Sequence, residues 1–248
     1  MNRLPLLLLA VPMLAWVAIP APTQAQANTT PAATRAAPAS APAAASSAPF
    51  LDLRGQAPIQ GNAAAGAGKA TVCMACHGPQ GIAIAPNFPN LAGQSATYLY
   101  VQLEQFHHGQ RRDPVMTGQA APLSDTDMRD LASHFASLAP KPAGRADTSS
   151  RGAQIFLAGD PSRGIPPCQG CHGSDALGPR AQPGRAPYPP WSTIPRLRGQ
   201  SAIYLTKRLT DFRNGIRPGS SNTRVMEGVA HTLDDADVQA LATYLSSL

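Results

Sequence analysis

The stretch TVCMACHGPQG, residues 71–81, brings two thiols and an imidazole within five residues, and PPCQGCHGSDA repeats this arrangement further along the chain. The six side chains are Cys73, Cys76 and His77 in the first copy, and Cys168, Cys171 and His172 in the second. These two Cys-x-x-Cys-His pentapeptides contain all four cysteines of the chain, so none remains for a disulfide framework. The pattern is typical of covalent haem attachment, in which the thiols bind the porphyrin and the adjacent His binds the iron.

Two other kinds of site also use paired cysteines. Two Cys-x-x-Cys pairs can form a four-thiolate zinc site, and a single pair can form a thioredoxin-like redox site. A zinc site would not use the His after each pair, and Cys76 and Cys168 are 92 positions apart. A redox site expects a βαβ pattern, which the flanking sequence lacks. Haem attachment is the favoured interpretation, with the zinc and redox sites as alternatives.

An internal duplication extends well beyond the cysteines. NLAGQSATYLYVQLEQFHHGQR, from Asn90, aligns with RLRGQSAIYLTKRLTDFRNGIR, from Arg196. Both copies continue with a Val-Met pair, at Met116 and Met226, and end in similar 17-residue segments. The second copy has about 11 more residues after its cysteines and 4 more before its Met. The chain is therefore predicted to contain two small domains of the same kind.

Each copy is predicted to be helical. The final segments begin at Ser124 and Asp234 with residue pairs that resemble capping boxes, and apolar residues then repeat at helical spacing. The same spacing follows Ser95 and Ser201, and there is no alternating strand pattern of useful length. We therefore expect an all-α fold in which a covalently held porphyrin supplies much of each thin core.

The composition divides the chain further. MNRLPLLLLAVPMLAWVAIPAPTQAQA has an early Arg3, an apolar run and a small-residue end, which is the layout of a secretory signal. The run is short for a membrane span, and an uncleaved anchor is the alternative. An Ala-, Pro- and Ser-rich stretch follows, typical of a flexible tether. The predicted segments are a signal peptide at 1–26, the tether at 27–50, the first domain at 51–140, a linker at 141–150 and the second domain at 151–248.

The net charge of +6 is spread among Ala and Pro, without the basic stripe of a nucleic-acid-binding protein. Residues 51–140 carry a net −1 and residues 141–248 a net +5. A basic docking face for an acidic redox partner is one interpretation of the second copy, and ordinary solvated charges are the other. The residues concerned are Arg196, Arg198, Lys207, Arg208, Arg213 and Arg217.

Met116 and Met226 are the methionine pair that the repeat relates, which favours iron ligation over core packing. A thioether closes the sixth coordination position of the iron, as an electron carrier requires.

The duplicated CxxCH, the P-x-L-x-G-Q-S segment, the downstream Met and the terminal helix together resemble the dihaem cytochrome c4 family, two class I cytochrome c domains in tandem, over about residues 55–248. The resemblance implies two tandem helical domains, each around one covalently bound haem c with a His and a Met as axial ligands. Carried over residue by residue, the first haem has Cys73, Cys76, His77 and Met116, and the second has Cys168, Cys171, His172 and Met226.

Two further residues follow from the resemblance. The carbonyls of Pro89 and Pro195 are candidates to accept the remaining N–H of the axial His, and the alternative is that these prolines only stiffen a loop. One stretch departs from the family pattern: RAQPGRAPYPPWSTIP, around Trp191, is an insert in the second copy. Haem exposure and domain contacts at this insert are left open.

The predicted function is electron transfer without substrate turnover, in the periplasm. The resemblance implies a quinol-oxidising complex or dehydrogenase as donor and a terminal oxidase or reductase as acceptor, with any membrane contact made through these partners. The charge distribution predicts no nucleic-acid partner. Alternatives are a dihaem enzyme that oxidises a sulfur compound or reduces peroxide, and a haem subunit docked permanently on a dehydrogenase. An enzyme needs an open or differently ligated haem, and the paired methionines argue against that.

Overall fold

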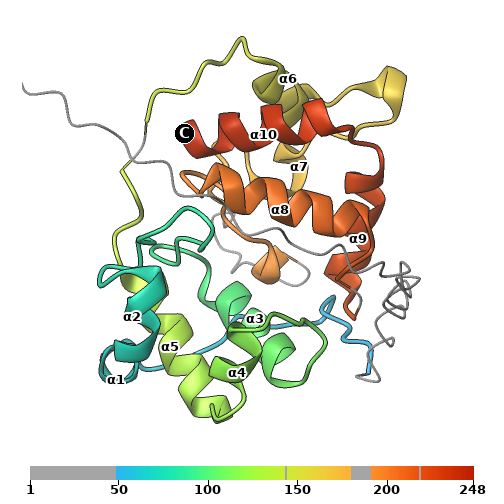
Figure 1. Ribbon diagram of the computed structural model, residues 1–248. Helices are drawn as coiled ribbons and strands as arrows, with labels where there is room; N and C mark the ends of the chain where they lie inside the picture. The colour runs from blue at the N-terminus through green and yellow to red at the C-terminus, as the bar shows by residue number, and fades with distance from the viewer. Residues whose placement is uncertain (1–48, 143, 180–190, 218) are drawn as a thin grey trace, which may run out of the picture. The chain divides into compact units, whose positions relative to one another are not determined.

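Two groups of helices follow one another along the chain in the computed structural model (Figure 1), which describes residues 49–142, 144–179, 191–217 and 219–248. The first lobe consists of α1 (Ala63–Lys69), α2 (Thr71–His77), α3 (Ala96–His107), α4 (Met116–Ala120) and α5 (Asp125–Ser137). The second lobe consists of α6 (Arg151–Ala158), η1 (Pro161–Arg163), α7 (Gln169–His172), η2 (Trp191–Thr193), α8 (Ala202–Arg213), α9 (Ser221–His231) and α10 (Asp235–Ser247). In these residues β-structure is limited to two isolated bridges, so the all-α prediction is confirmed.

The predicted signal peptide, most of the tether and most of the insert lie outside the described residues. Within the described ranges, no helix is both long and apolar enough to cross a membrane.

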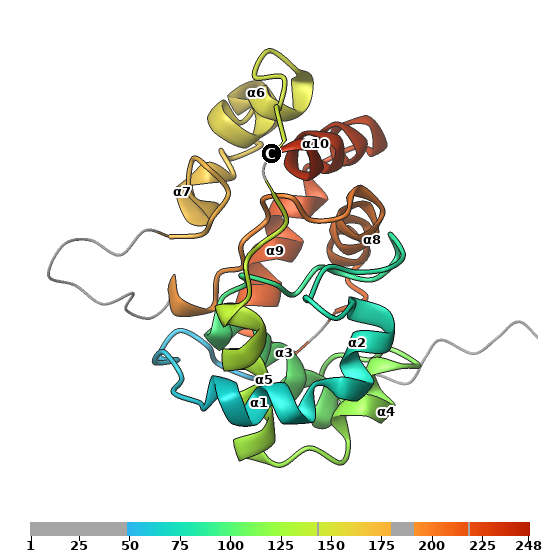
Figure 2. The same ribbon diagram turned by 90° about the vertical axis from the view of Figure 1, so that its left-hand side faces the viewer.

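In the first lobe, α1 and α3 pack against α5 (Figure 2). The buried face of α5 presents Met128, Leu131 and Phe135 at helical spacing, each less than 5% exposed. Gly66 lets α1 approach closely, because a Cβ at this position would lie 2.1 Å from the Asp130 carbonyl oxygen. The α3 residues Leu99 and Phe106 also line the cavity of the functional site.

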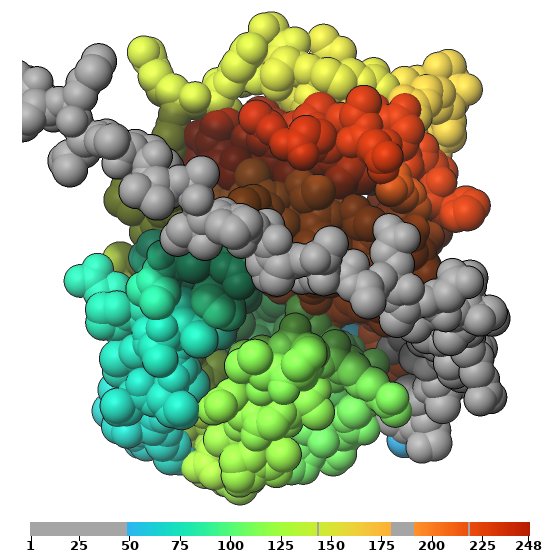
Figure 3. All heavy atoms as spheres, in the orientation of Figure 1, coloured from blue at the N-terminus to red at the C-terminus, as the bar shows by residue number. Residues whose placement is uncertain are grey.

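The second lobe repeats this packing with α6 and α8 against α10. Figure 3 shows α10, in red, with the segment that contains α6, in yellow, beside it. Gly152 has the role of Gly66, because its Cβ would lie 2.1 Å from the Ala240 carbonyl oxygen. Both terminal helices begin with complete capping boxes at Ser124 and Asp234, which confirms the predicted starts.

The two methionine segments differ in length. Met116 begins α4, which has 5 residues, whereas Met226 lies in the middle of α9, which has 11. The four extra residues of the second copy amount to about one helical turn. Equivalent methionines are therefore presented by helices of unequal length.

The segment before the first lobe pairs with the second lobe. Leu51 N–H donates to the Gly219 carbonyl at 2.6 Å, and Ser221 N–H donates to the Leu51 carbonyl at 3.0 Å. Leu53 N–H then donates to Ser221 Oγ at 2.9 Å. Residues 49–53 therefore hold the N-terminus of α9, the helix that carries Met226.

Candidate functional site

Each predicted axial His ends a short helix and is buried. His77 and His172 are 5% and 6% exposed. Their Nδ1 atoms lie 2.9 Å from the Pro89 carbonyl oxygen and 3.0 Å from the Pro195 carbonyl oxygen. A carbonyl only accepts, so Nδ1 carries the proton and Nε2 retains a free lone pair. Burial lowers the pKa of both imidazoles, although the proline carbonyls oppose the shift, and this favours the neutral form that binds a metal.

A cavity of about 650 Å³ extends through both lobes and is lined by both histidines. Met116 and Met226 also line it, whereas Met74 and Met128 do not. Met128 is instead 3% exposed in the core of the first lobe. The remaining lining is largely apolar and includes Leu99, Phe106, Leu131, Phe135, Leu205, Leu209 and Phe212. A cavity of this size and lining suits a large apolar ring.

The four cysteines are half-buried and none forms a disulfide. Cys73 and Cys76 line the cavity, and Cys168 and Cys171 precede His172 at α7. Burial raises the pKa of the Cys168 thiol to about 11. Across the described residues, no three His, Cys, Asp or Glu side chains are grouped as metal ligands, so the four-thiolate zinc alternative has no site here.

Three arginines that line the cavity have unsatisfied donors. The Nε atoms of Arg111, Arg208 and Arg217 are buried and have no hydrogen-bond partner. Arg111 and Arg217 share Gln102 Oε1, with bonds of 2.6 and 2.9 Å. Burial, with a contribution from Arg111, lowers the pKa of Arg217 to about 10. Since buried donors normally have partners, this cationic edge of an apolar cavity fits the propionate carboxylates of haem.

These arginines bear on both interpretations of the basic stretch. It was interpreted either as a docking face or as ordinary solvated charges, but Arg217 is 8% exposed and the Arg208 side chain 13% exposed. Arg208 and Lys207 are also paired with Asp211, at 2.9 and 3.0 Å. Both interpretations require exposed charges, so neither holds for Arg208 and Arg217. Sequence spacing gave no signal for this, because their positions depend on how the lobes meet.

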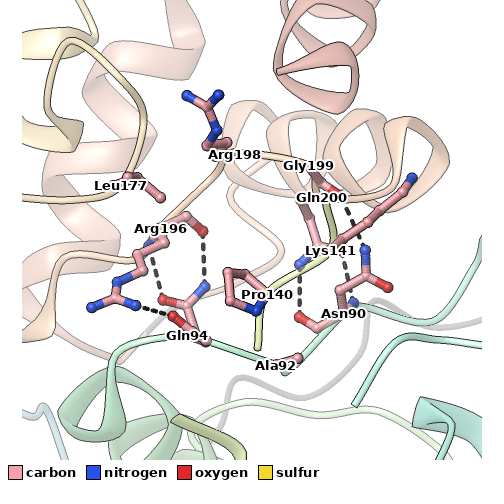
Figure 4. Close-up of a pocket in the computed structure, with 11 residues that line it drawn as sticks. Asn90, Ala92, Gln94, Pro140, Lys141, Leu177, Arg196, Arg198, Gly199 and Gln200 are labelled. Carbon is pink, nitrogen blue, oxygen red and sulfur yellow. Dashed lines mark hydrogen bonds between the residues drawn. The ribbon is translucent and has the colours of Figure 1, made fainter. Parts of the chain in front are cut away.

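The lobes meet through the duplicated L-x-G-Q-S segments (Figure 4). Gln94 Oε1 accepts from Arg196 N–H at 2.8 Å, and its Nε2 donates to the Arg196 carbonyl at 2.8 Å. Gln200 makes the equivalent bonds with Asn90, at 2.8 Å to its N–H and 2.9 Å to its carbonyl. The glycine before each Gln has a φ of 67°, a conformation that favours glycine.

Serine side chains add further hydrogen bonds to this junction, the contact between the two lobes. Ser95 Oγ donates to the Ser192 carbonyl at 3.1 Å, and Ser201 Oγ donates to the Pro86 carbonyl. Ser192, in the described end of the insert, also donates from Oγ to the Gln56 carbonyl at 2.6 Å. The insert thus contributes to lobe contact. In the sequence, Gln94 and Gln200 stand out only as equivalent positions of the repeat, and this shared spacing is the one signal of their role.

Two helical lobes that each carry a CxxCH pentapeptide, with the His of each lining one largely apolar cavity, define a c-type cytochrome with two haems. The Cytochrome c family model matches residues 63–139 and 149–248. Cytochrome c4 of Pseudomonas aeruginosa is 40% identical over 200 residues, covering 80% of this chain and 94% of that protein. The thiosulfate dehydrogenase electron acceptor of Thiomonas intermedia is 36% identical over 186 residues, covering 72% of this chain and 79% of that protein.

The crystal structure of reduced cytochrome c4 from Pseudomonas stutzeri superposes with a TM-score of 0.67 and 39% identity, covering 76% of this chain and 99% of that one. The chain belongs to the dihaem cytochrome c4 family. The predicted resemblance, the two haem c groups and the role as an electron carrier rather than an enzyme are thereby confirmed.

Proposed function

We propose that the first haem is bound by Cys73 and Cys76, with His77 and Met116 as axial ligands of its iron. In the second lobe, Cys168 and Cys171 bind the haem and His172 and Met226 are the axial ligands. The observation that carries this proposal is that Met116 and Met226, but neither Met74 nor Met128, line the cavity together with both histidines.

Haem supplies one-electron chemistry by cycling between ferric and ferrous iron. The protein residues orient the ligands of the iron and bind the propionates. The Pro89 and Pro195 carbonyls fix the tautomer and orientation of the axial imidazoles. The thioethers of Met116 and Met226 would bind the haem irons and exclude other ligands. Arg111, Arg208 and Arg217 would hold the propionates and balance their charge inside the cavity.

The experiment that tests these ligands is the absorption and EPR spectrum of the purified oxidised protein. We expect both ferric haems to be low-spin and to show the methionine-to-iron charge-transfer band, because every iron has two strong axial ligands. A high-spin component that accounts for one of the two haems would contradict the ligand set and support an enzyme with an open haem.

The partners are redox proteins, and we propose a quinol-oxidising complex or a dehydrogenase as donor and a terminal oxidase or reductase as acceptor. A thiosulfate dehydrogenase is a specific donor candidate, because the Thiomonas relative is named as the acceptor of that enzyme. Mixing each reduced donor with this protein and following haem reduction tests both candidates. The productive donor should reduce the haems within its turnover time, and a donor that leaves them oxidised is excluded.

We propose a periplasmic location, reached by export and cleavage of residues 1–26. The Arg3, apolar run and small-residue end support a cleaved signal. The N-terminal sequence of the exported protein tests it, and an intact Met1 would instead indicate the membrane anchor.

A further inference from the structure

The glutamine contacts at the junction continue into the histidine sites. Arg196 N–H belongs to the same peptide group as the Pro195 carbonyl, which accepts from His172 Nδ1 at 3.0 Å. Gln94 of the first lobe accepts from that N–H at 2.8 Å. One unbroken hydrogen-bonded chain therefore runs from Gln94, through a single peptide group, to the histidine of the other lobe.

An equivalent chain of hydrogen bonds runs from the second lobe to the histidine of the first. Asn90 N–H shares a peptide group with the Pro89 carbonyl, which accepts from His77 Nδ1 at 2.9 Å. Gln200 of the second lobe accepts from Asn90 N–H at 2.8 Å. Gln94 and Gln200 are both 7% exposed, so water competes little for these bonds. Each lobe thus contacts the other lobe's histidine through one peptide.

Hydrogen bonds in a chain polarise one another, and the effect is stronger in a buried setting of low dielectric constant. An acceptor on the peptide N–H makes the carbonyl of the same peptide a stronger acceptor. A stronger acceptor at Nδ1 makes the imidazole a more basic ligand. A more basic ligand stabilises ferric iron more than ferrous iron and therefore lowers the reduction potential.

From this geometry we propose that Gln94 and Gln200 are positioning residues that tune the reduction potential of the haem in the opposite lobe. Gln94 lowers the potential of the second haem, and Gln200 lowers that of the first. The inference rests on the proposed axial ligands. Its distinctive feature is the crossed pattern, which a simple structural clamp between the lobes does not produce.

The test replaces each glutamine by methionine, which has a similar length but no hydrogen-bonding amide. Gln94→Met should raise the potential of the second haem and leave the first unchanged, and Gln200→Met should do the reverse. Because each Gln acts one peptide away from the histidine, we expect about a threefold change in the one-electron reduction equilibrium, about 28 mV at 59 mV per tenfold. Potentials are read from a redox titration by NMR, with the axial methionine methyl signals assigned in single Met variants.

Ser192→Ala is the matched control. It removes a 2.6 Å hydrogen bond between the lobes, from Ser192 Oγ to the Gln56 carbonyl, but leaves both peptide chains intact. Both haem potentials should stay at the unsubstituted values. If the serine variant and both Gln variants shift the two haems alike, junction loosening is the cause and the proposal is wrong.

A second variant at Gln94 and two contradicting outcomes complete the test. Should Gln94→Met fail to fold, Gln94→Asn keeps an amide but is one methylene too short to reach Arg196, and it should shift the second haem in the same direction. Shifts confined to the haem of the substituted lobe, or no shift at all, would overturn the proposal. If the unsubstituted protein lacks the low-spin spectrum with the methionine-to-iron band, the ligand assignment fails. If that spectrum is present but each Gln variant does not shift the potential of the haem in the opposite lobe, only the proposed effect of the glutamines is refuted.

Discussion

At the scale of single residues, chemical type and position along the repeat indicate which methionines line the cavity. Met226 and Met128 are both methionines, yet one lines the cavity and the other is buried in the core of the first lobe. The repeat separates them. Met226 is aligned with Met116 in the first copy, whereas Met128 is aligned with Val238 in the second. Position therefore distinguishes a proposed ligand that lines the cavity from a packing residue of the same type.

Met226→Ala should leave the second haem covalently attached, because Cys168 and Cys171 are untouched. The iron loses its sixth ligand, so the methionine band of that haem should disappear and added cyanide or carbon monoxide should bind. The absorption spectrum measures both effects. Met128→Leu, which nearly conserves core volume, is the control and should keep both bands. An unchanged spectrum in Met226→Ala would place the ligand elsewhere.

At the scale of helices, the start of α5 combines a cap with an ion pair. Lys69 Nζ lies 2.7 Å from Asp127 Oδ1 and 2.7 Å from Asp130 Oδ2, and so joins the end of α1 to the first turns of α5. Asp127 also accepts from Ser124 in the capping box. Lys69, followed by Ser124, lowers the pKa of Asp127 from 3.8 to about 2.

A carboxyl whose folded pKa is lowered stabilises the protein above its unfolded pKa, and this contribution is lost as the pH falls through the folded value. For Asp127 the window runs from about pH 3.8 down to about 2. Lys69→Met should therefore move the acid-unfolding midpoint to higher pH, as followed by far-UV circular dichroism. Lys141→Met removes a lysine for which the described residues show no ion pair and should leave the midpoint in place; equal shifts would mean that net charge alone is responsible.

At the scale of the whole molecule, residues 49–53 tie the start of the first lobe to α9 of the second. Leu51 pairs with Ser220 in an isolated parallel bridge, and its N–H donates to Gly219. Residues 49–53 therefore hold the helix of Met226. Neither composition nor periodicity predicts this contact, because its two sides are about 170 residues apart in the sequence.

Leu51→Pro removes the N–H that donates to Gly219. The loss of one backbone hydrogen bond costs about 1 kcal/mol, which lowers the melting temperature of a protein of this size by about 2–4 °C. Amide hydrogen exchange should also increase at Ser221. Phe50→Pro places the same residue one position earlier, at an exposed side chain, and should change neither value. Equal losses in both variants would assign the effect to proline itself.

Features that depend on neighbours along the chain can be predicted from the sequence, whereas features that depend on contacts between distant residues cannot. The CxxCH spacing and the capping boxes involve neighbours along the chain, so they were readable directly. The buried Arg111 and Arg217 were not, because their shared acceptor Gln102 depends on the contact of two lobes. The crossed contacts of Gln94 and Gln200 also form only in three dimensions.

The equivalence of the contacts on the two sides of the junction gives it the form of the interface in a two-fold symmetric dimer. Separate subunits joined in this way come apart on dilution, whereas lobes in one chain meet at an effective concentration on the order of millimolar, whatever the bulk concentration. Assembly therefore needs no partner search. Neither half has to match a copy of itself, so α9 could lengthen and an insert could be accommodated in one half alone without loss of the pairing.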